Sequence, residues 1–93
     1  MNRDKAIKTT FAHYPFILEI ENQIAVAAQN GCFQTMVNIE RDQEKLQLFT
    51  YWAYFNNYRL EDVTLPQHHN YMYIISWRPY YEVEVNKDEQ FEG

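Results

Sequence analysis

The chain has 93 residues, with eight Lys and Arg against 13 Asp and Glu, and its formal net charge is −5. This length predicts a single domain over residues 1–93, because a core of this size buries only roughly 60 to 70% of the unfolded surface and cannot be divided further. Apolar residues make up 46% of the sequence. No apolar run approaches the ~18 residues of a membrane span, and the first residues lack the apolar core of a signal peptide. We therefore expect a soluble protein that is not secreted by a signal peptide and has no membrane partner.

The cysteine count and the charge exclude further classes. Cys32 is the single cysteine, which rules out an internal disulfide and a site of several thiolates. The acidic balance argues against duplex nucleic acid as the main ligand, because neutralising phosphates requires clustered Lys and Arg.

Charge is unevenly distributed along the chain. Residues 1–10 carry a net charge of +2, from Arg3, Lys5 and Lys8 against Asp4. Residues 79–93 carry −4, with Lys87 against five acidic residues: Glu82, Glu84, Asp88, Glu89 and Glu92. This acidic segment is either a contact arm for a basic partner or a solvated end that keeps a small protein soluble.

Residues 15–30 have the apolar spacing of an amphipathic helix. Pro15 suits the first helical position, and Gly31 suits the left-handed residue that closes a helix. The apolar side chains on one side are Phe16, Ile17, Ile20, Ile24, Ala27 and Ala28. Residues 1–14 form a possible helical extension capped by Asn2, and the two segments together would make one long helix bent at Pro15.

The middle of the chain predicts a strand followed by a second helix. Residues 33–40 alternate, with Phe33, Thr35, Val37 and Ile39 on one face. Residues 41–56 return to helical spacing, with Asp42 and Glu44 near the favourable N-terminal end. Asn57 suits a left-handed closing residue. The apolar side of this helix carries Leu48, Phe49, Trp52, Ala53 and Phe55.

The last third of the chain is predicted to be strand. Residues 58–65 and 71–77 read as an antiparallel hairpin joined by the loop 66–70. Residues 80–85 alternate again, and Pro79 before them lacks an amide donor, so this strand should lie at a sheet edge or continue the previous strand across a bulge.

These elements predict an α+β fold of order α-β-α-β-β, with an optional further strand. The sheet would have three or four strands, with two helices on one face and the strand 71–77 in its centre. The predicted core consists of Ile20, Ile24, Val37, Phe49, Trp52, Ile75 and Trp77.

The layout resembles that of small proteins encoded by tailed bacteriophages. The likeness is carried by Ala28-Gln29-Asn30-Gly31 at a helix end, by the strand Met36-Val37-Asn38-Ile39, and by the last hairpin strand Tyr73-Ile74-Ile75-Ser76-Trp77. It covers residues 15–78. Such proteins commonly have Gly where this chain has Asn57, a mild departure because Asn tolerates the same backbone geometry. The resemblance implies a compact α+β fold and a location in the host cytoplasm or the virion, and it transfers no activity.

The sequence contains no pattern typical of catalysis or of cofactor or metal binding. His68 and His69 are adjacent in a loop and would point in different directions, and His13 suits a structural role near the predicted bend. Cys32 follows a helix C-terminus, where the helix dipole disfavours a thiolate. The paired carboxylates Glu61-Asp62 and Glu82 with Glu84 sit in segments that read as solvated strand faces. We therefore expect no enzyme, no cofactor and no metal.

Three sets of residues are candidates for binding a protein partner. Tyr51 and Tyr54 point away from the core side of the second helix, as tyrosines of binding surfaces do; partial cover by the N-terminal helix is the alternative. A continuous first helix would present a second apolar line along Ile7, Phe11, Tyr14 and Leu18. A strand at 80–85 would present Tyr81, Val83 and Val85 at an open sheet edge.

These observations favour a non-catalytic protein–protein interaction module, as a phage-encoded minor virion or assembly component. Its partner would be another virion protein or a second copy of the chain in a homo-oligomer. One alternative is a small acidic inhibitor of a host defence or nucleic-acid enzyme, whose carboxylates imitate phosphate. A weaker alternative is a single-stranded nucleic-acid binder that stacks bases on its tyrosines, although such a site also requires a basic groove.

Overall fold

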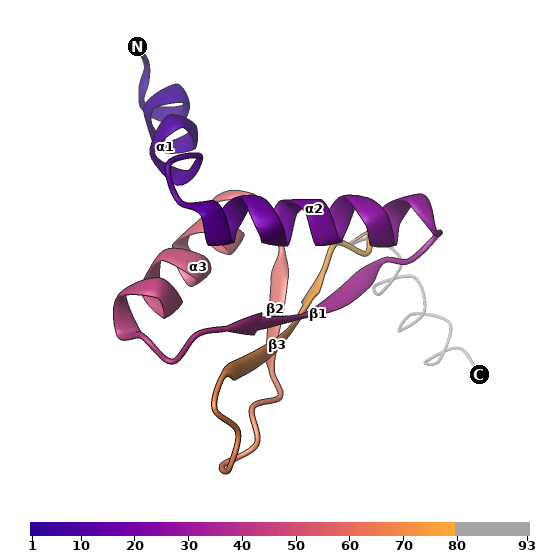
Figure 1. Cartoon of the computed structure of the whole chain (residues 1–93). Helices are drawn as coiled ribbons and strands as arrows, with labels where there is room; N and C mark the ends of the chain where they lie inside the picture. Colours follow the sequence, from indigo (N-terminus) through magenta and orange to yellow (C-terminus); the bar gives the residue numbers. More distant parts are fainter. Residues whose placement is uncertain (80–93) are drawn as a thin grey trace, which may run out of the picture.

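The computed structural model describes residues 1–79, which form three helices and three strands in the order α-α-β-α-β-β (Figure 1). Their bounds are α1 Arg3–Phe11, α2 Pro15–Gln29, β1 Gln34–Ile39, α3 Gln43–Phe55, β2 Arg59–Asp62 and β3 Tyr71–Ser76. The predicted α+β class with a three-stranded sheet is confirmed. The further strand predicted over residues 80–85 lies outside the described residues.

The sheet has the strand order β1-β3-β2, and both pairings are antiparallel. The last hairpin strand is therefore central, as the sequence predicts. Val37 lies opposite Tyr73 in the register, and Ile75 is flanked by Thr35 and Leu60. Because side chains alternate along a strand, these residues share one face of the sheet. That face packs on the helices: the Phe49 ring of α3 lies 5.5 Å from the ring of Tyr73.

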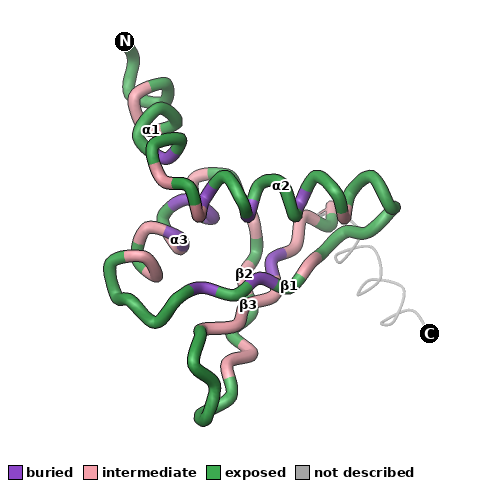
Figure 2. The backbone as a smooth tube through the Cα atoms, viewed as in Figure 1, coloured by how far each residue is buried: buried purple, intermediate pink, exposed green. Residues whose placement is uncertain are grey.

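The core lies between that face and the helices (Figure 2). Its ten buried apolar residues are Phe11, Ile17, Ile20, Ile24, Val37, Ile39, Phe49, Trp52, Ala53 and Ile75. Six of the seven predicted core residues are among them. Trp77 is half-buried instead, because it follows the end of β3, where its N–H donates to the Phe33 carbonyl at 2.9 Å and its ring meets Tyr58. Phe33, expected on the inner face, precedes β1 and is 44% exposed.

The N-terminal region forms two helices, so the prediction of one long bent helix is wrong. A residue before proline is pushed out of helical backbone geometry, and Tyr14 before Pro15 accordingly has φ −104° and ψ 112°. Asn2 caps α1 as predicted, its Oδ1 accepting from the Lys5 N–H at 2.8 Å. Figure 1 shows α1 projecting away from the rest of the molecule, and its last residue, Phe11, packs against Phe55 of α3.

The predicted helix ends are confirmed by backbone geometry. Gly31 after α2 has φ 85°, and Asn57 after α3 has φ 62°. At the start of α3, the Asp42 carboxylate accepts hydrogen bonds from the N–H groups of Glu44 and Lys45.

The hairpin strands are shorter than predicted because side chains replace part of the backbone ladder. The Asp62 carboxylate accepts from the Thr64 N–H at 2.9 Å, which turns the chain directly after β2. The Thr64 hydroxyl then accepts from the Met72 N–H at 2.9 Å. The Thr64 hydroxyl thus accepts a hydrogen bond that a backbone carbonyl of the predicted strand would otherwise accept.

Candidate protein-binding groove

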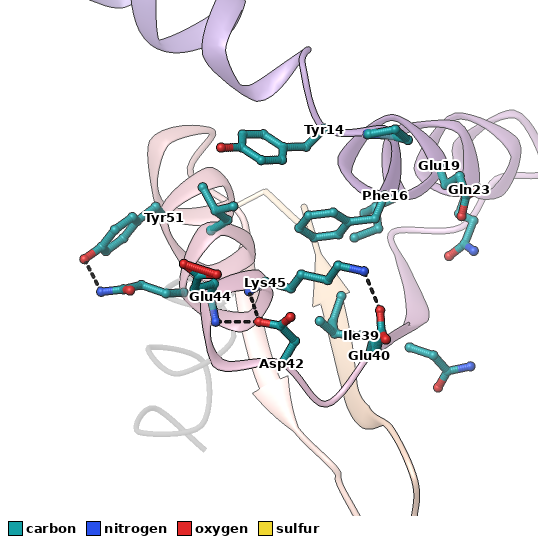
Figure 3. A pocket seen from close by; sticks show the side chains of 15 residues that line it. Tyr14, Phe16, Glu19, Gln23, Ile39, Glu40, Asp42, Glu44, Lys45 and Tyr51 are labelled. Atoms are coloured by element: carbon teal, nitrogen blue, oxygen red, sulfur yellow. Dashed lines mark hydrogen bonds and ion pairs between the residues drawn. The ribbon is translucent and has the colours of Figure 1, made fainter.

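An open groove of about 810 Å³ lies between residues 15–23 of α2, residues 44–51 of α3, and the end of β1 with the link that follows it (Figure 3). Its apolar lining includes Phe16, Ile39 and Leu48, which belong to the core or pack against it. Tyr14 at the start of α2 and Tyr51 on α3 line the same groove. A concave surface with apolar lining and polar edges is the usual form of a binding site.

Charged residues give this groove an acidic character. Four carboxylates line it, those of Glu19, Glu40, Asp42 and Glu44, against the single ammonium group of Lys45. Counting these charges as −4 and +1 gives a local net charge of −3. The groove therefore attracts cations.

Lys45 is held inside the groove. Its ammonium group forms an ion pair with the Glu40 carboxylate and lies 5.7 Å from the centre of the Phe16 ring. The hydrogen bond to Glu40 and, to a lesser degree, the charges of Glu40 and Asp42 raise the pKa of Lys45, while desolvation works in the opposite direction. Lys45 therefore stays charged and neutralises one of the four acids.

The four carboxylates differ in how far they are engaged. Glu40 is paired with Lys45, and Asp42 is engaged as the cap of α3. The carboxylates of Glu19 and Glu44 have no hydrogen bond or ion pair with any other described residue. These two acids are thus available to a ligand.

The structure brings together two of the predicted partner-binding residues, Tyr14 and Tyr51, which line the groove. Tyr51 is 57% exposed, and its hydroxyl oxygen accepts from Gln47 Nε2 at 2.8 Å. Tyr54 is 77% exposed but does not line the groove. Tyr51 and Tyr54 are both exposed, as expected for the outer side of this helix, and α1 meets α3 at Phe55 instead.

Of the remaining predicted residues, Ile7, Phe11 and Leu18 do not form one surface. Phe11 is buried, Ile7 is half-buried, and Leu18 is exposed on α2 without lining the groove. The apolar line expected along a continuous helix is broken because the chain changes direction at Tyr14. Tyr81, Val83 and Val85 lie outside the described residues.

Sequence reasoning missed the acidic character of the groove. In the sequence, Asp42 and Glu44 fit a helix start, and Phe16 fits the apolar side of the first amphipathic helix. The cluster of acids in residues 40–44 is visible in the sequence, but Glu19 joins it only through packing of α2 beside α3.

The other candidate groups are not among the residues that line the groove. His13, His68, His69 and Cys32 are all exposed. Within residues 1–79, no group of three His, Cys, Asp or Glu side chains is arranged to hold a metal ion. His68 contributes its carbonyl oxygen, which accepts from Arg41 Nε at 3.2 Å.

No protein-family model matches this sequence, and no curated protein or solved structure shows significant similarity to it. The helices of the described region are too short or too polar to cross a bilayer.

Proposed function

We propose that the protein is a non-catalytic interaction module whose groove receives a segment of a protein partner. The observation that carries this proposal is the composition of the groove: an apolar lining, two unengaged carboxylates and the exposed Tyr51. Apolar contact supplies affinity in such sites, whereas charge at the edge guides orientation and the choice of partner.

The resemblance to small proteins of tailed bacteriophages supports a more specific proposal. In that setting the module is a minor virion or assembly component, and its partner is another virion protein or a second copy of the chain. It would act in the host cytoplasm or in the virion.

A second candidate is a small acidic inhibitor of a host defence or nucleic-acid enzyme. The four carboxylates gathered at one groove favour it, because a basic nucleic-acid site would accept them in place of phosphates. The apolar lining favours the interaction module, since a phosphate mimic gains nothing from Phe16 or Leu48. Single-strand binding is the weakest candidate, because the acids beside Tyr51 repel a phosphate backbone.

Site-specific photocrosslinking tests the proposal. A photoreactive phenylalanine at Tyr51 should form a discrete adduct with one protein in the cells that naturally make the chain. The control replaces Glu61 with the same photoreactive phenylalanine, because Glu61 is exposed on β2 and does not line the groove. Adducts of equal yield at both positions, or none at Tyr51, would contradict a groove partner. An adduct that an added DNA oligonucleotide suppresses would favour the inhibitor.

A further inference from the structure

We propose that α1 of one copy of this chain docks into the groove of a second copy. This inference rests on the proposed function, because it takes the groove as a docking site and names its occupant. It combines two features that the structure leaves unmatched within one copy: a basic helix that projects from the molecule and an acidic groove beside its base (Figures 1 and 3).

The projecting helix α1 is attached to its own molecule at one end. Phe11 is buried and Ile7 is half-buried against the core. The side-chain hydrogen bonds and the ion pair of the described α1 residues are all made within residues 2–10. Lys5 and Lys8 are exposed, and their ammonium groups have no hydrogen-bond or ion-pair partner among residues 1–79. Being three residues apart, they are neighbours on the helix surface.

The charges of the two surfaces are complementary. Residues 3–11 carry three basic side chains against Asp4, a net charge of +2, and the groove carries −3. Lys5 and Lys8 can therefore face the unengaged carboxylates of Glu19 and Glu44. The aliphatic stems of lysine can at the same time cover the apolar lining, because lysine buries its stem while its ammonium group reaches an acid.

The helix α1 does not reach the groove of its own molecule. Phe11 fixes it against Phe55, the last residue of α3, whereas the groove is lined by α3 residues between Glu44 and Tyr51. Lys8 instead borders a separate, smaller hollow near Trp52 and Phe55. The contact therefore requires a second copy, and a two-fold arrangement closes it, with each α1 in the partner's groove.

The acidic residues 80–93 suit the groove less well than α1 does. By sequence, residues 80–93 carry a net charge of −4 and would be repelled by the carboxylates of the groove. A different protein with a basic amphipathic helix could also occupy the groove, and the experiment below distinguishes it from α1 of a second copy.

Charge reversal with mixing tests the proposal. Wild-type protein should be dimeric by sedimentation equilibrium at low salt, and added salt should weaken the dimer because it screens charges at the surface. The variant Lys5→Glu/Lys8→Glu and the variant Glu19→Lys/Glu44→Lys should each dimerise about tenfold or more weakly. Mixed together, these two variants should form a heterodimer, because each reversed helix then meets a reversed groove and each native helix a native groove.

The controls separate folding from docking. Far-ultraviolet circular dichroism and melting should show both double variants folded, since all four side chains are exposed. Glu61→Lys reverses an exposed charge outside the groove and should leave the dimer intact.

The outcomes distinguish this inference from the proposed function. A wild-type monomer up to millimolar concentration, or double variants that do not pair on mixing, would overturn docking of α1. An adduct between Tyr51 and a different protein would then still support a groove partner. Loss of both the dimer and every Tyr51 adduct would reject the groove itself.

Discussion

Trp52 is the largest fully buried side chain among the described residues. It is 1% exposed, its ring lies 6.1 Å from Phe49 and 5.3 Å from Tyr58, and its Nε1 donates to Glu21 Oε2 at 3.2 Å. Trp52→Ala should lower the free energy of unfolding by about 3 to 5 kcal/mol, because it leaves a large cavity. Chemical denaturation measures this loss. Trp52→Phe keeps much of the packing and should cost less, and a loss below about 1 kcal/mol for the alanine variant would show that Trp52 is not central.

Tyr58 should make stability depend on pH in the alkaline range. Burial and, secondarily, the charge of Glu21 raise its pKa above the ordinary value of 10.0. The folded state therefore holds the phenolic proton more tightly than the unfolded state. The resulting stabilisation is complete below the unfolded pKa and is lost as the pH rises through the folded pKa. Stability should accordingly fall as the pH rises above 10.0.

Urea denaturation across this range checks the effect. Tyr58→Phe should reduce the slope of stability against pH without abolishing it, because burial also raises the pKa of Tyr73. Tyr54→Phe is the matched control, since Tyr54 is 77% exposed. An unchanged slope in Tyr58→Phe would contradict the assignment to Tyr58.

At the scale of the elements, the ends of α2 and α3 depend on left-handed residues. Gly31 has φ 85°, and a Cβ added there would meet no atom within 4 Å. Gly31→Ala therefore isolates the backbone cost, which should be about 1 kcal/mol. Asn57→Gly, at φ 62°, should change stability by less than ~0.5 kcal/mol because both residues accept this geometry. Equal melting temperatures for wild type and Gly31→Ala would show that the left-handed closure is not required.

The elements that the sequence predicts correctly depend on single residues acting locally. Pro15, Gly31 and Asn57 mark helix ends through their own backbone preferences, and alternation in residues 34–39 marks β1. The end of β2 was missed because the Thr64 hydroxyl, bonded to Met72, takes the place of backbone pairing. The helical spacing of apolar residues likewise continues through Tyr14 in the sequence. Pro15 nevertheless keeps Tyr14 out of helical backbone geometry.

The groove could be predicted only in part. Its acids at Asp42 and Glu44 are neighbours in sequence, and the exposure of Tyr51 follows from the helical period. Glu19 joins them only when α2 packs beside α3, and no short-range pattern encodes that contact.

At the scale of the whole molecule, residues 1–79 form two layers, and their helices pack on one face of the sheet. The helices cover the face that carries Val37 and Ile75, which are 1% and 0% exposed. On the other face, Met36 pairs across Ile74 with Glu61 and is 52% exposed. Residues 1–79 place no helix over this face (Figure 1). It therefore tolerates polar side chains that the inner face cannot accept.

Two adjacent substitutions in β1 test this arrangement. Met36→Lys should change the free energy of unfolding by no more than ~0.5 kcal/mol, because its side chain points to water. It should also reduce aggregation, since β1 is an edge strand and lysine on an edge discourages pairing between molecules. Val37→Lys, one position along, should leave the chain unfolded, because burying an unpaired ammonium group costs more than a chain of this size can offset. Urea denaturation and light scattering measure both effects. A large loss of stability in Met36→Lys would mean that the outer face of the sheet is covered.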